Sequence, residues 1–273
     1  MKRAVVLGFL AACSGGSNGS DAPVDDNLLR PDSSDDIDLD GIKNTDDNCP
    51  TVVNQNQGNE DGDTMGDACD PCPVVADDAP PDTDGDGVAD ACDPFPSMPG
   101  DFIRYFEGFH KAVPAGWEEI GTWTHVSGGS IQTMSAAAGL AIIATDRTRE
   151  TISAGLTFDA VTSTSRAGVI DTKMAGGPGV ACVLAADPFA SVAVYATNDA
   201  GNATQASYEQ TASTQYVVKL KRNMTQYECA ASNGTSSTSG FATLALSNTP
   251  YLSGITASNA TVRFHWFMVV ESL

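Results

Sequence analysis

The sequence predicts an all-β protein in which an antiparallel sandwich follows an irregular segment stabilised by metal ions and disulfides. Three observations support this prediction. Beyond Asp101, short apolar stretches alternate with clusters of turn residues, and none has a convincing long helical period. Between Asp36 and Asp93, aspartates recur at fixed spacing. Cysteines also recur at fixed spacing in that segment, which is too poor in large apolar residues to bury a core.

The N-terminal residues have the features of a targeting segment. Lys2 and Arg3 precede the apolar stretch Ala4–Ala12, which is too short to span a bilayer. The stretch ends in Leu10-Ala11-Ala12-Cys13, which resembles a bacterial lipoprotein signal. The resemblance implies a signal peptide over residues 1–12, cleavage before Cys13, and lipidation of Cys13. An ordinary secretory signal with a coincidental cysteine is the alternative.

Either signal places the mature protein outside the cytoplasm, where disulfides form. Ser14 follows the lipidated cysteine in place of an aspartate, and this resembles sorting to the outer membrane of a diderm bacterium. We therefore expect a lipid-anchored protein of the bacterial cell envelope. Residues 13–35 begin with a Ser/Gly-rich run and are expected to form a flexible tether. Lipidation of one of the seven cysteines leaves an even number, which can pair completely.

Three acidic loops follow, each close to the pattern D-x-D-x-D-G-x-x-D/N-x-x-D. Positions 1, 3 and 5 of such a loop point carboxylate oxygens at one centre, and glycine at position 6 permits the sharp turn. Ca²⁺ takes roughly 6–8 oxygen ligands in flexible geometry, so this pattern predicts calcium binding. The candidate ligands are Asp36, Asp38, Asp40, Asn44 and Asp47 in the first loop, Asn59, Asp61, Asp63, Asp67 and Asp70 in the second, and Asp82, Asp84, Asp86, Asp90 and Asp93 in the third.

The cysteines form a tandem repeat with the loops. The spacing pairs Cys49 with Cys69 and Cys72 with Cys92, because both intervals are 20 residues and the copies repeat every 23 residues. The flanks, such as Pro71-Cys72-Pro73, cannot start a long helix, whereas EF-hand and dockerin loops need helices beside them.

The segment over residues 36–93 resembles thrombospondin type 3 repeats. The match includes Asp47-Asn48-Cys49-Pro50, then Asn54 and Gln57, and then Gly66-Asp67-Ala68-Cys69-Asp70. The resemblance implies a calcium-wrapped structure with little helix or sheet, in which ions and disulfides replace a hydrophobic core. It also adds the amide of Asn54 to the candidate calcium ligands.

Several residues depart from this pattern. Thr64 takes the place of glycine in the second loop, so that turn is expected to be strained or its site weaker. Asn59 replaces the first aspartate of the same loop, and Asp77 and Pro80 stand where the pattern has Asn and Gln. A disordered, highly charged linker is the alternative, but it would need neither the cysteine period nor the loop spacing.

Charge separates the chain into two regions and limits its partners. The whole chain has a net charge of −21, and residues 14–100 contain 22 acidic residues against 2 basic ones. Residues 101–273 contain 13 acidic residues against 10 basic ones. Since no basic stripe exists, nucleic acid is not an expected partner. Residues 94–100 are rich in proline and form the expected linker between the regions.

The region from residue 101 to 273 is predicted to form about ten or more short strands. In the last of them, Val262, Phe264, Trp266, Met268 and Val270 are expected to share one face. The predicted strands are Leu140–Thr145, Ile152–Asp159, Ala167–Thr172, Val180–Ala186, Ser191–Thr197, Tyr216–Arg222, Gln226–Ala231, Phe241–Leu246 and Thr261–Glu271.

This region resembles a concanavalin A-like or laminin-G-like jelly roll. The resemblance rests on Phe106-Glu107-Gly108-Phe109, the following Trp117 and Trp123, and the stretches 216–223 and 254–264. An immunoglobulin-like sandwich is the alternative, although the region is long for one.

The polar residues of this region favour a binding function over catalysis. Cys182 and Cys229 lie in predicted strands and are expected to pair. No spaced group of carboxylates of the glycosidase type is present, so we expect no enzyme. The tryptophans are more often core residues than sugar contacts in such a sandwich.

The sequence as a whole predicts a calcium-binding lipoprotein of the cell surface, with the repeats as a stiff stalk. The sandwich would bind a polysaccharide or an extracellular or cell-surface protein. A purely structural envelope lipoprotein and a divergent glycoside hydrolase are the alternatives. The sequence leaves the oligomeric state open.

Overall fold

The computed structural model describes residues 35–111, 116–135, 138–145, 149–172, 179–186, 191–196, 202–243 and 251–273. The predicted signal peptide, Cys13 and residues 13–34 of the predicted tether lie outside these ranges. None of the residues that the structure describes belongs to a helix with the length and apolar character needed to cross a bilayer.

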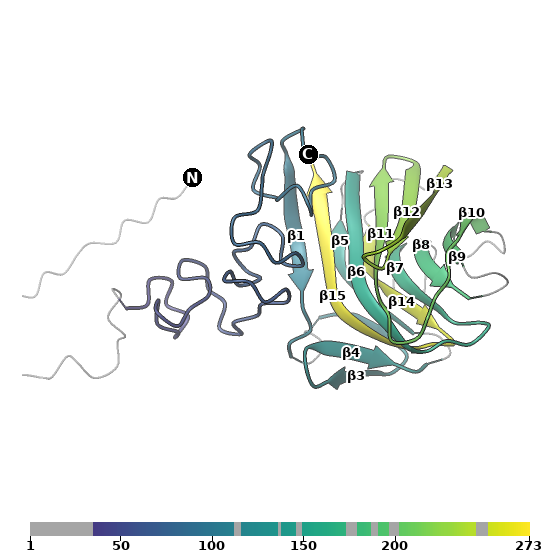
Figure 1. Ribbon diagram of the computed structural model, residues 1–273, viewed down its shortest axis with the longest axis horizontal. Coiled ribbons are helices and arrows are strands. Elements are labelled where there is room, and N and C mark those ends of the chain that lie inside the picture. Colours follow the sequence, from purple (N-terminus) through teal and green to yellow (C-terminus); the bar gives the residue numbers. More distant parts are fainter. Residues whose placement is uncertain are drawn as a thin grey trace, which may run out of the picture.

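Two antiparallel sheets form the sandwich (Figure 1). Sheet A contains β1 (Asp101–Glu107), β3 (Trp123–Val126), β4 (Ser130–Thr133), β6 (Arg149–Ala160), β11 (Gln215–Asn223), β12 (Gln226–Ser232), β13 (Ser237–Thr243) and β15 (Thr261–Ser272). Sheet B contains β2 (Glu118–Ile120), β5 (Ala138–Thr145), β7 (Arg166–Thr172), β8 (Gly179–Ala185), β9 (Ser191–Ala196), β10 (Asn202–Ser207) and β14 (Tyr251–Ser258). The predicted all-β antiparallel sandwich is confirmed.

Most of the predicted strands exist, and the errors are at weakly patterned segments. The strands β1 to β4, β10 and β14 were not predicted individually. The segment predicted as Phe241–Leu246 begins earlier, since β13 runs from Ser237 to Thr243, and residues 244–250 lie outside the described ranges.

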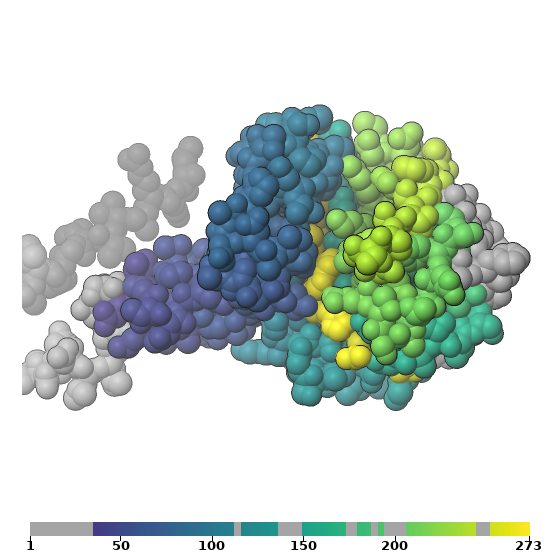
Figure 2. All heavy atoms as spheres, in the orientation of Figure 1, coloured from purple at the N-terminus to yellow at the C-terminus, as the bar shows by residue number. Residues whose placement is uncertain are grey.

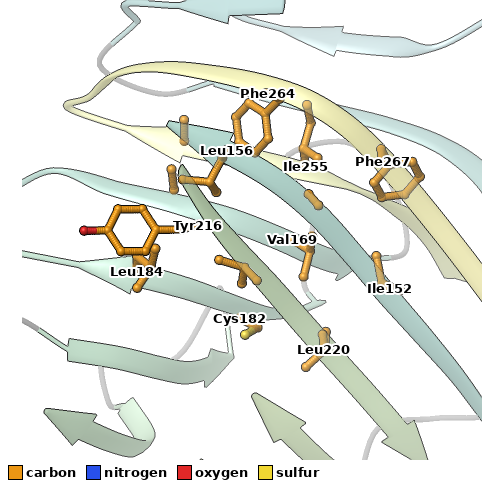
Figure 3. Close-up of a cluster of buried hydrophobic side chains, with 14 of the residues drawn as sticks. Ile152, Leu156, Val169, Cys182, Leu184, Tyr216, Leu220, Ile255, Phe264 and Phe267 are labelled. Carbon is orange, nitrogen blue, oxygen red and sulfur yellow. The ribbon is translucent and has the colours of Figure 1, made fainter. Parts of the chain in front are cut away.

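The main core lies between the two sheets. Figure 3 shows part of it, with Ile152 and Leu156 of β6 and Phe264 of β15 facing Val169 and Leu184 of sheet B. These side chains are fully shielded from solvent, and their removal from water is the main favourable contribution to folding.

A disulfide also joins the sheets. Cys182 of β8 bonds Cys229 of β12, in agreement with the pairing expected from the sequence. The other two disulfides, Cys49–Cys69 and Cys72–Cys92, lie in the repeat region and also match the expected pairs.

The prediction that one face of the last strand holds all its alternate apolar residues is wrong. Val262 and Phe264 point into the main core, but the pairing of β15 with β6 shifts register between Phe264 and Trp266. After this bulge, Trp266 and Met268 lie on the outer face of sheet A. Simple alternation fails because both faces of this strand are buried.

The repeat region covers part of that outer face. Residues 35–100 contain turns and bends but no strand. Figures 1 and 2 show the second and third repeats against β1 and β15, with the first repeat, in purple, farthest from the sandwich. The Cys72–Cys92 disulfide and Val88 pack on Trp266 and Met268 in a second apolar cluster. This cluster is a hydrophobic contact between repeats and sandwich.

Candidate functional site

Hydrogen bonds close the first and third acidic loops in the same way. The carboxylate of Asp36 accepts hydrogen bonds from the backbone N–H of Leu39 at 2.8 Å and of Gly41 at 3.0 Å. Asp82 holds the backbone N–H of Gly85 at 2.7 Å and of Gly87 at 3.0 Å. Gly41 and Gly87, at position 6, have φ of 94° and 97°, which glycine adopts without steric cost.

The second loop accommodates Thr64 by a different set of bonds. Thr64 is absent from the described residues with positive φ, so it avoids the strain expected from the sequence. Its backbone N–H and its hydroxyl both donate to Asp78 Oδ1, at 2.9 and 2.6 Å. The loop still turns through Gly62, whose φ is 79° and whose N–H donates to Asn59.

The aspartate at position 5 links each loop to the backbone fourteen residues further on. Asp40 Oδ2 accepts from the N–H of Asn54 at 2.9 Å, and Asp63 Oδ2 accepts from that of Asp77 at 3.2 Å. Asp86 Oδ2 accepts from Gly100 at 2.9 Å. The three repeats therefore share one framework, although their sequences differ at several positions.

This framework brings carboxylates together in four groups whose oxygen atoms lie within 4.8 Å of one another in the described part of the chain. The first and third groups contain positions 1, 3 and 5 of their loops, and the second contains positions 3, 5 and 12. The fourth adds a residue that the sequence reasoning missed, Asp101. The groups are Asp36, Asp38 and Asp40; Asp61, Asp63 and Asp70; Asp82, Asp84 and Asp86; and Asp86, Asp93 and Asp101.

Positions 3 and 12 leave oxygen atoms without partners in every repeat. These atoms are buried, yet none of the described groups donates a hydrogen bond to them, which is costly unless a cation or proton binds there. They are Asp38 Oδ2 and Asp47 Oδ2, Asp61 Oδ2 and Asp70 Oδ2, and both oxygens of Asp84 with Asp93 Oδ2.

The crowding of carboxylates shifts their proton affinities. Burial, followed by the charge of Asp61 and other neighbouring aspartates, raises the pKa of Asp70 to about 6. Burial also raises the pKa of Asp38 and of Asp84, with repulsion from neighbouring aspartates adding to it. Carboxylates that resist ionisation in the ion-free protein are those that a cation would stabilise.

The residues at position 9 lie outside the four groups. Asp67 and Asp90 accept hydrogen bonds from the backbone N–H of Glu60 and Thr83, each at 2.8 Å, and Asn44 accepts one from Ile37 at 3.0 Å. The described geometry gives these residues a loop-closing role.

Amides surround position 12 of the first repeat. Asp47 Oδ1 accepts from the Gln57 side chain at 2.9 Å, and the amide of Asn54 lies beside Asp40 and Asp47. Asn54, whose amide is a candidate ligand, therefore lies close to two of the candidate carboxylates of the first repeat.

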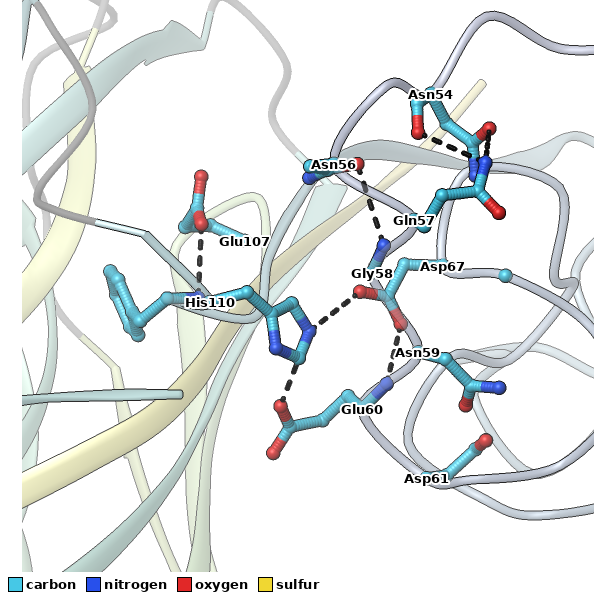
Figure 4. A network of polar contacts seen from close by, with 12 residues as sticks. Asn54, Asn56, Gln57, Gly58, Asn59, Glu60, Asp61, Asp67, Glu107 and His110 are labelled. Atoms are coloured by element: carbon cyan, nitrogen blue, oxygen red, sulfur yellow. Dashed lines mark hydrogen bonds and ion pairs between the residues drawn. The ribbon is translucent and has the colours of Figure 1, made fainter. Parts of the chain in front are cut away.

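A polar network joins the second repeat to the sandwich (Figure 4). His110 Nε2 lies 3.1 Å from Asp67 Oδ2 and 3.8 Å from Glu60 Oε2. The bond to Asp67 raises the pKa of His110, while burial raises the pKa of Glu60 to about 8. The network adds polar contacts to the apolar contact made by Trp266.

Outer side chains of β11, β12 and β13 form a second candidate surface, which we term the open face: Lys219, Lys221, Glu228, Ala230 and Phe241. A hollow of about 210 Å³ separates its first four residues from Cys92–Pro94 of the third repeat. Phe241 is 67% exposed at the far edge. Lys219, Lys221 and Glu228 are half-buried beside this hollow, whereas Phe241 lines a second hollow of about 320 Å³ with Gln226 and Tyr227.

The tryptophans do not form part of this surface. Trp117 belongs to the main core, Trp123 packs against that core, and Trp266 is only 4% exposed beneath the repeats. Two acids inside the sandwich, Glu150 and Asp171, share the guanidinium of Arg222 at 3.6 and 3.3 Å. Both are fully buried, so a sugar ring cannot reach them.

No model of a known protein family matches this sequence, and no curated protein matches it. Among solved structures, basic winged bean lectin with Tn-antigen is similar at a TM-score of 0.51 and 6% identity, over 63% of this chain and 99% of that chain. Winged bean acidic lectin complexed with methyl-α-D-galactose is similar at 0.50 and 6%, over 63% and 98%.

The GH43 protein BlXynB from Bacillus licheniformis has a TM-score of 0.50 and 13% identity, over 62% of this chain but only 39% of that chain. The similarity thus covers less than half of that protein. At these identities the comparisons show the fold alone, which is the jelly-roll sandwich of lectins and related modules.

Proposed function

We propose that this chain is a calcium-binding protein in which thrombospondin type 3-like repeats hold a carbohydrate-binding sandwich. The calcium part rests on one observation, the buried carboxylate oxygens without described partners at positions 3 and 12 of all three repeats. The donor set fits the ion, because it consists of oxygens from several carboxylates and amides in loops with little other structure.

Calcium would replace a hydrophobic core in the repeats. Two carboxylates at 4.8 Å repel each other by about 1 kcal/mol in a water-like dielectric and about 3.5 kcal/mol at an effective dielectric of 20. An ion at ~100 times its Kd adds roughly 2.7 kcal/mol to stability. Each group of carboxylates therefore destabilises the folded repeats without an ion and stabilises them when an ion binds.

The test uses the non-lipidated mature protein with calcium and with chelator. Equilibrium dialysis should show several bound ions. Limited proteolysis should cut residues 36–93 only after chelation, while residues 101–273 stay intact in both conditions. Equal resistance of the repeats with and without chelator would contradict the calcium part of the proposal.

We further propose that Cys13 is lipidated and that the protein is anchored in the bacterial cell envelope, with outer-membrane placement as the expectation from Ser14. The support is the signal-like sequence, together with disulfides that favour a compartment outside the cytoplasm. Metabolic labelling with a fatty acid, compared between the wild type and Cys13→Ser, would test the anchor.

The carbohydrate part is supported by the fold shared with winged bean lectins and by the open face. Phe241 offers an apolar ring to stack on a sugar, and Glu228, its cross-strand partner, offers hydrogen bonds beside it. We place the ligand there because the repeats cover the neighbouring part of the same sheet face. We propose binding without catalysis.

A screen of glycans and polysaccharides with the mature protein tests this placement. Phe241→Ala should weaken binding by about 1.5–3 kcal/mol, the usual range for full burial of one large apolar side chain. Met134→Ala is the matched control, because Met134 is 75% exposed on the segment after β4. Failure of the wild type to bind any glycan would favour a structural envelope lipoprotein instead.

A further inference from the structure

The boundary between the third repeat and the sandwich contains an acidic group that no repeat pattern predicts. Asp101 is the first residue of β1 and is only 3% exposed. Its carboxylate lies with those of Asp86 and Asp93, positions 5 and 12 of the third loop, with oxygens within 4.8 Å of one another. Two parts of the fold therefore meet at three carboxylates.

The backbone holds this arrangement in place. Asp86 Oδ2 accepts hydrogen bonds from the N–H groups of Gly100 at 2.9 Å and of Asp101 at 2.6 Å. Asp93 accepts a hydrogen bond from the N–H of Phe95. Because both loop aspartates also hold the connecting backbone, the Asp101 side chain enters the group from a fixed position.

Lys219 and Lys221 line the same hollow as Asp93, but no described ion pair joins either of them to the group. Asp93 Oδ2 and Asp101 Oδ2 are buried and have no hydrogen-bond partner among the described residues. No ion pair between described residues includes any of the three aspartates. The ammonium of Lys221 is engaged elsewhere, since it donates to Pro94 O at 2.8 Å and lies 3.9 Å from the centre of the Phe95 ring.

The proton affinity of Asp93 reflects this crowding. Burial first, and then contact with Asp101, raises the pKa of Asp93 to about 7. Hydrogen bonds from backbone N–H groups, in contrast, lower the pKa of Asp86, although burial opposes them. The closeness of the three carboxylates and the two buried oxygens without described partners are the geometric reasons to expect a cation in the group.

The first repeat offers a comparison. There the amide of Asn54 lies beside Asp40 and Asp47, which are positions 5 and 12 of that loop. In the third repeat the corresponding neighbour is a carboxylate, and it comes from the sandwich. Because Asp101 carries a negative charge and Asn54 does not, the boundary group suits a divalent cation better than the corresponding group of the first repeat.

We propose that Asp86, Asp93 and Asp101 bind a divalent cation of the calcium type, and that this ion fixes the first strand of the sandwich to the third repeat. The proposal rests on the proposed calcium function of the repeats and extends it to a ligand outside them. An ion at this boundary holds the sandwich and the third repeat together, because its ligands come from both. The ions of the other loops have ligands from the repeats alone.

The test compares Asp101→Ala and Asp101→Asn with the wild type in the full mature protein. Equilibrium dialysis counts bound calcium, and hydrogen exchange follows the N–H groups of Gly100 and Asp101. We expect each variant to lose one ion or to bind it at least roughly tenfold more weakly, because ligand charge sets calcium affinity in such sites. Exchange at Gly100 should become as fast as in chelated wild type, while Ile42 and Cys49 stay protected.

Asp46→Ala is the matched control, because Asp46 is exposed and lies outside the four carboxylate groups. It should bind as many ions as the wild type. The Asn variant keeps the shape of the side chain, so it remains informative if the Ala variant does not fold. An unchanged ion count and affinity in Asp101→Asn would contradict the proposal that the Asp101 carboxylate binds a cation at this boundary. A wild type that binds no calcium would instead refute the proposed function itself.

Discussion

Replacement of Trp266 by alanine should release the third repeat from the sandwich without unfolding the sandwich. Trp266 lies outside the main core, over Gly155 of β6 and against the Cys72–Cys92 disulfide and Val88. A methyl group on Gly155 would come within 2.3 Å of the indole nitrogen, so the ring lies directly on the sheet backbone. The ring therefore connects the two parts of the protein.

The expected magnitude follows from the burial of the ring. A tryptophan buries about 200 Å², which corresponds to about 5 kcal/mol at 25 cal/mol per Å². Measured losses for such replacements are about 3–5 kcal/mol. Since about 1.4 kcal/mol is a factor of ten, a loss of about 3 kcal/mol raises the population of the released state more than 100-fold.

Reduction of the disulfides measures this population. Cys72 and Cys92 are 1% and 5% exposed, so a reductant reaches their bond mainly in the released state. After timed reduction and alkylation, mass spectrometry should show Cys72–Cys92 opening at least tenfold faster in Trp266→Ala, with Cys182–Cys229 unchanged. Phe241→Ala, an exposed aromatic on the same face of sheet A, is the control. Equal acceleration of both bonds would mean global unfolding and would refute this assignment.

Three further predictions concern the sheets, the third loop and pH. Replacing Cys182 and Cys229 by alanine should cost about 4 kcal/mol, because the bond closes a loop of 47 residues; an unchanged midpoint of urea unfolding would contradict this. Gly87→Ala should cost about 1 kcal/mol and weaken calcium binding, since φ at Gly87 is 97°, whereas Gly116→Ala, with φ of 95° outside the repeats, should leave binding unchanged. Without calcium, Asp70 retains its proton from the ordinary pKa of 3.8 up to about 6, so the folded repeats lose stability as pH rises through this window. Calcium binds the ionised form, so its affinity should rise over the same window; titrations at about pH 5 and about pH 7.5 that agree would exclude this linkage.

Local spacing explains why the repeats were predictable. Positions 1, 3 and 5 of a tight loop converge whatever surrounds the loop, and the groups of Asp36 and of Asp82 show this directly. Likewise, Cys49 and Cys69 occupy equivalent places in a short period, so their pairing follows from sequence distance. The strands β6 to β9 were found for a similar reason, because each is a short apolar run between turn residues.

The strands and the bulge that the sequence did not predict depend on neighbouring segments and not on local spacing. The polar strand β10 and the short strand β3 are defined by their neighbours and have little pattern of their own. The bulge after Phe264 turns Trp266 and Met268 to the outer face of β15, which the repeats bury, so the strand is apolar on both sides. A period of two cannot describe a strand whose two faces are both covered.

The sequence by itself determined that this chain has loops of clustered carboxylates, disulfides at a fixed period and an all-β sandwich, because each of these follows from spacing within a short segment. Only the tertiary structure decided that Asp101 lies with Asp86 and Asp93 and that the third repeat packs on Trp266. It also decided that the open face lies beside that repeat. These contacts join segments whose relative position depends on the packing of the whole sandwich, and no local pattern of residues encodes that packing.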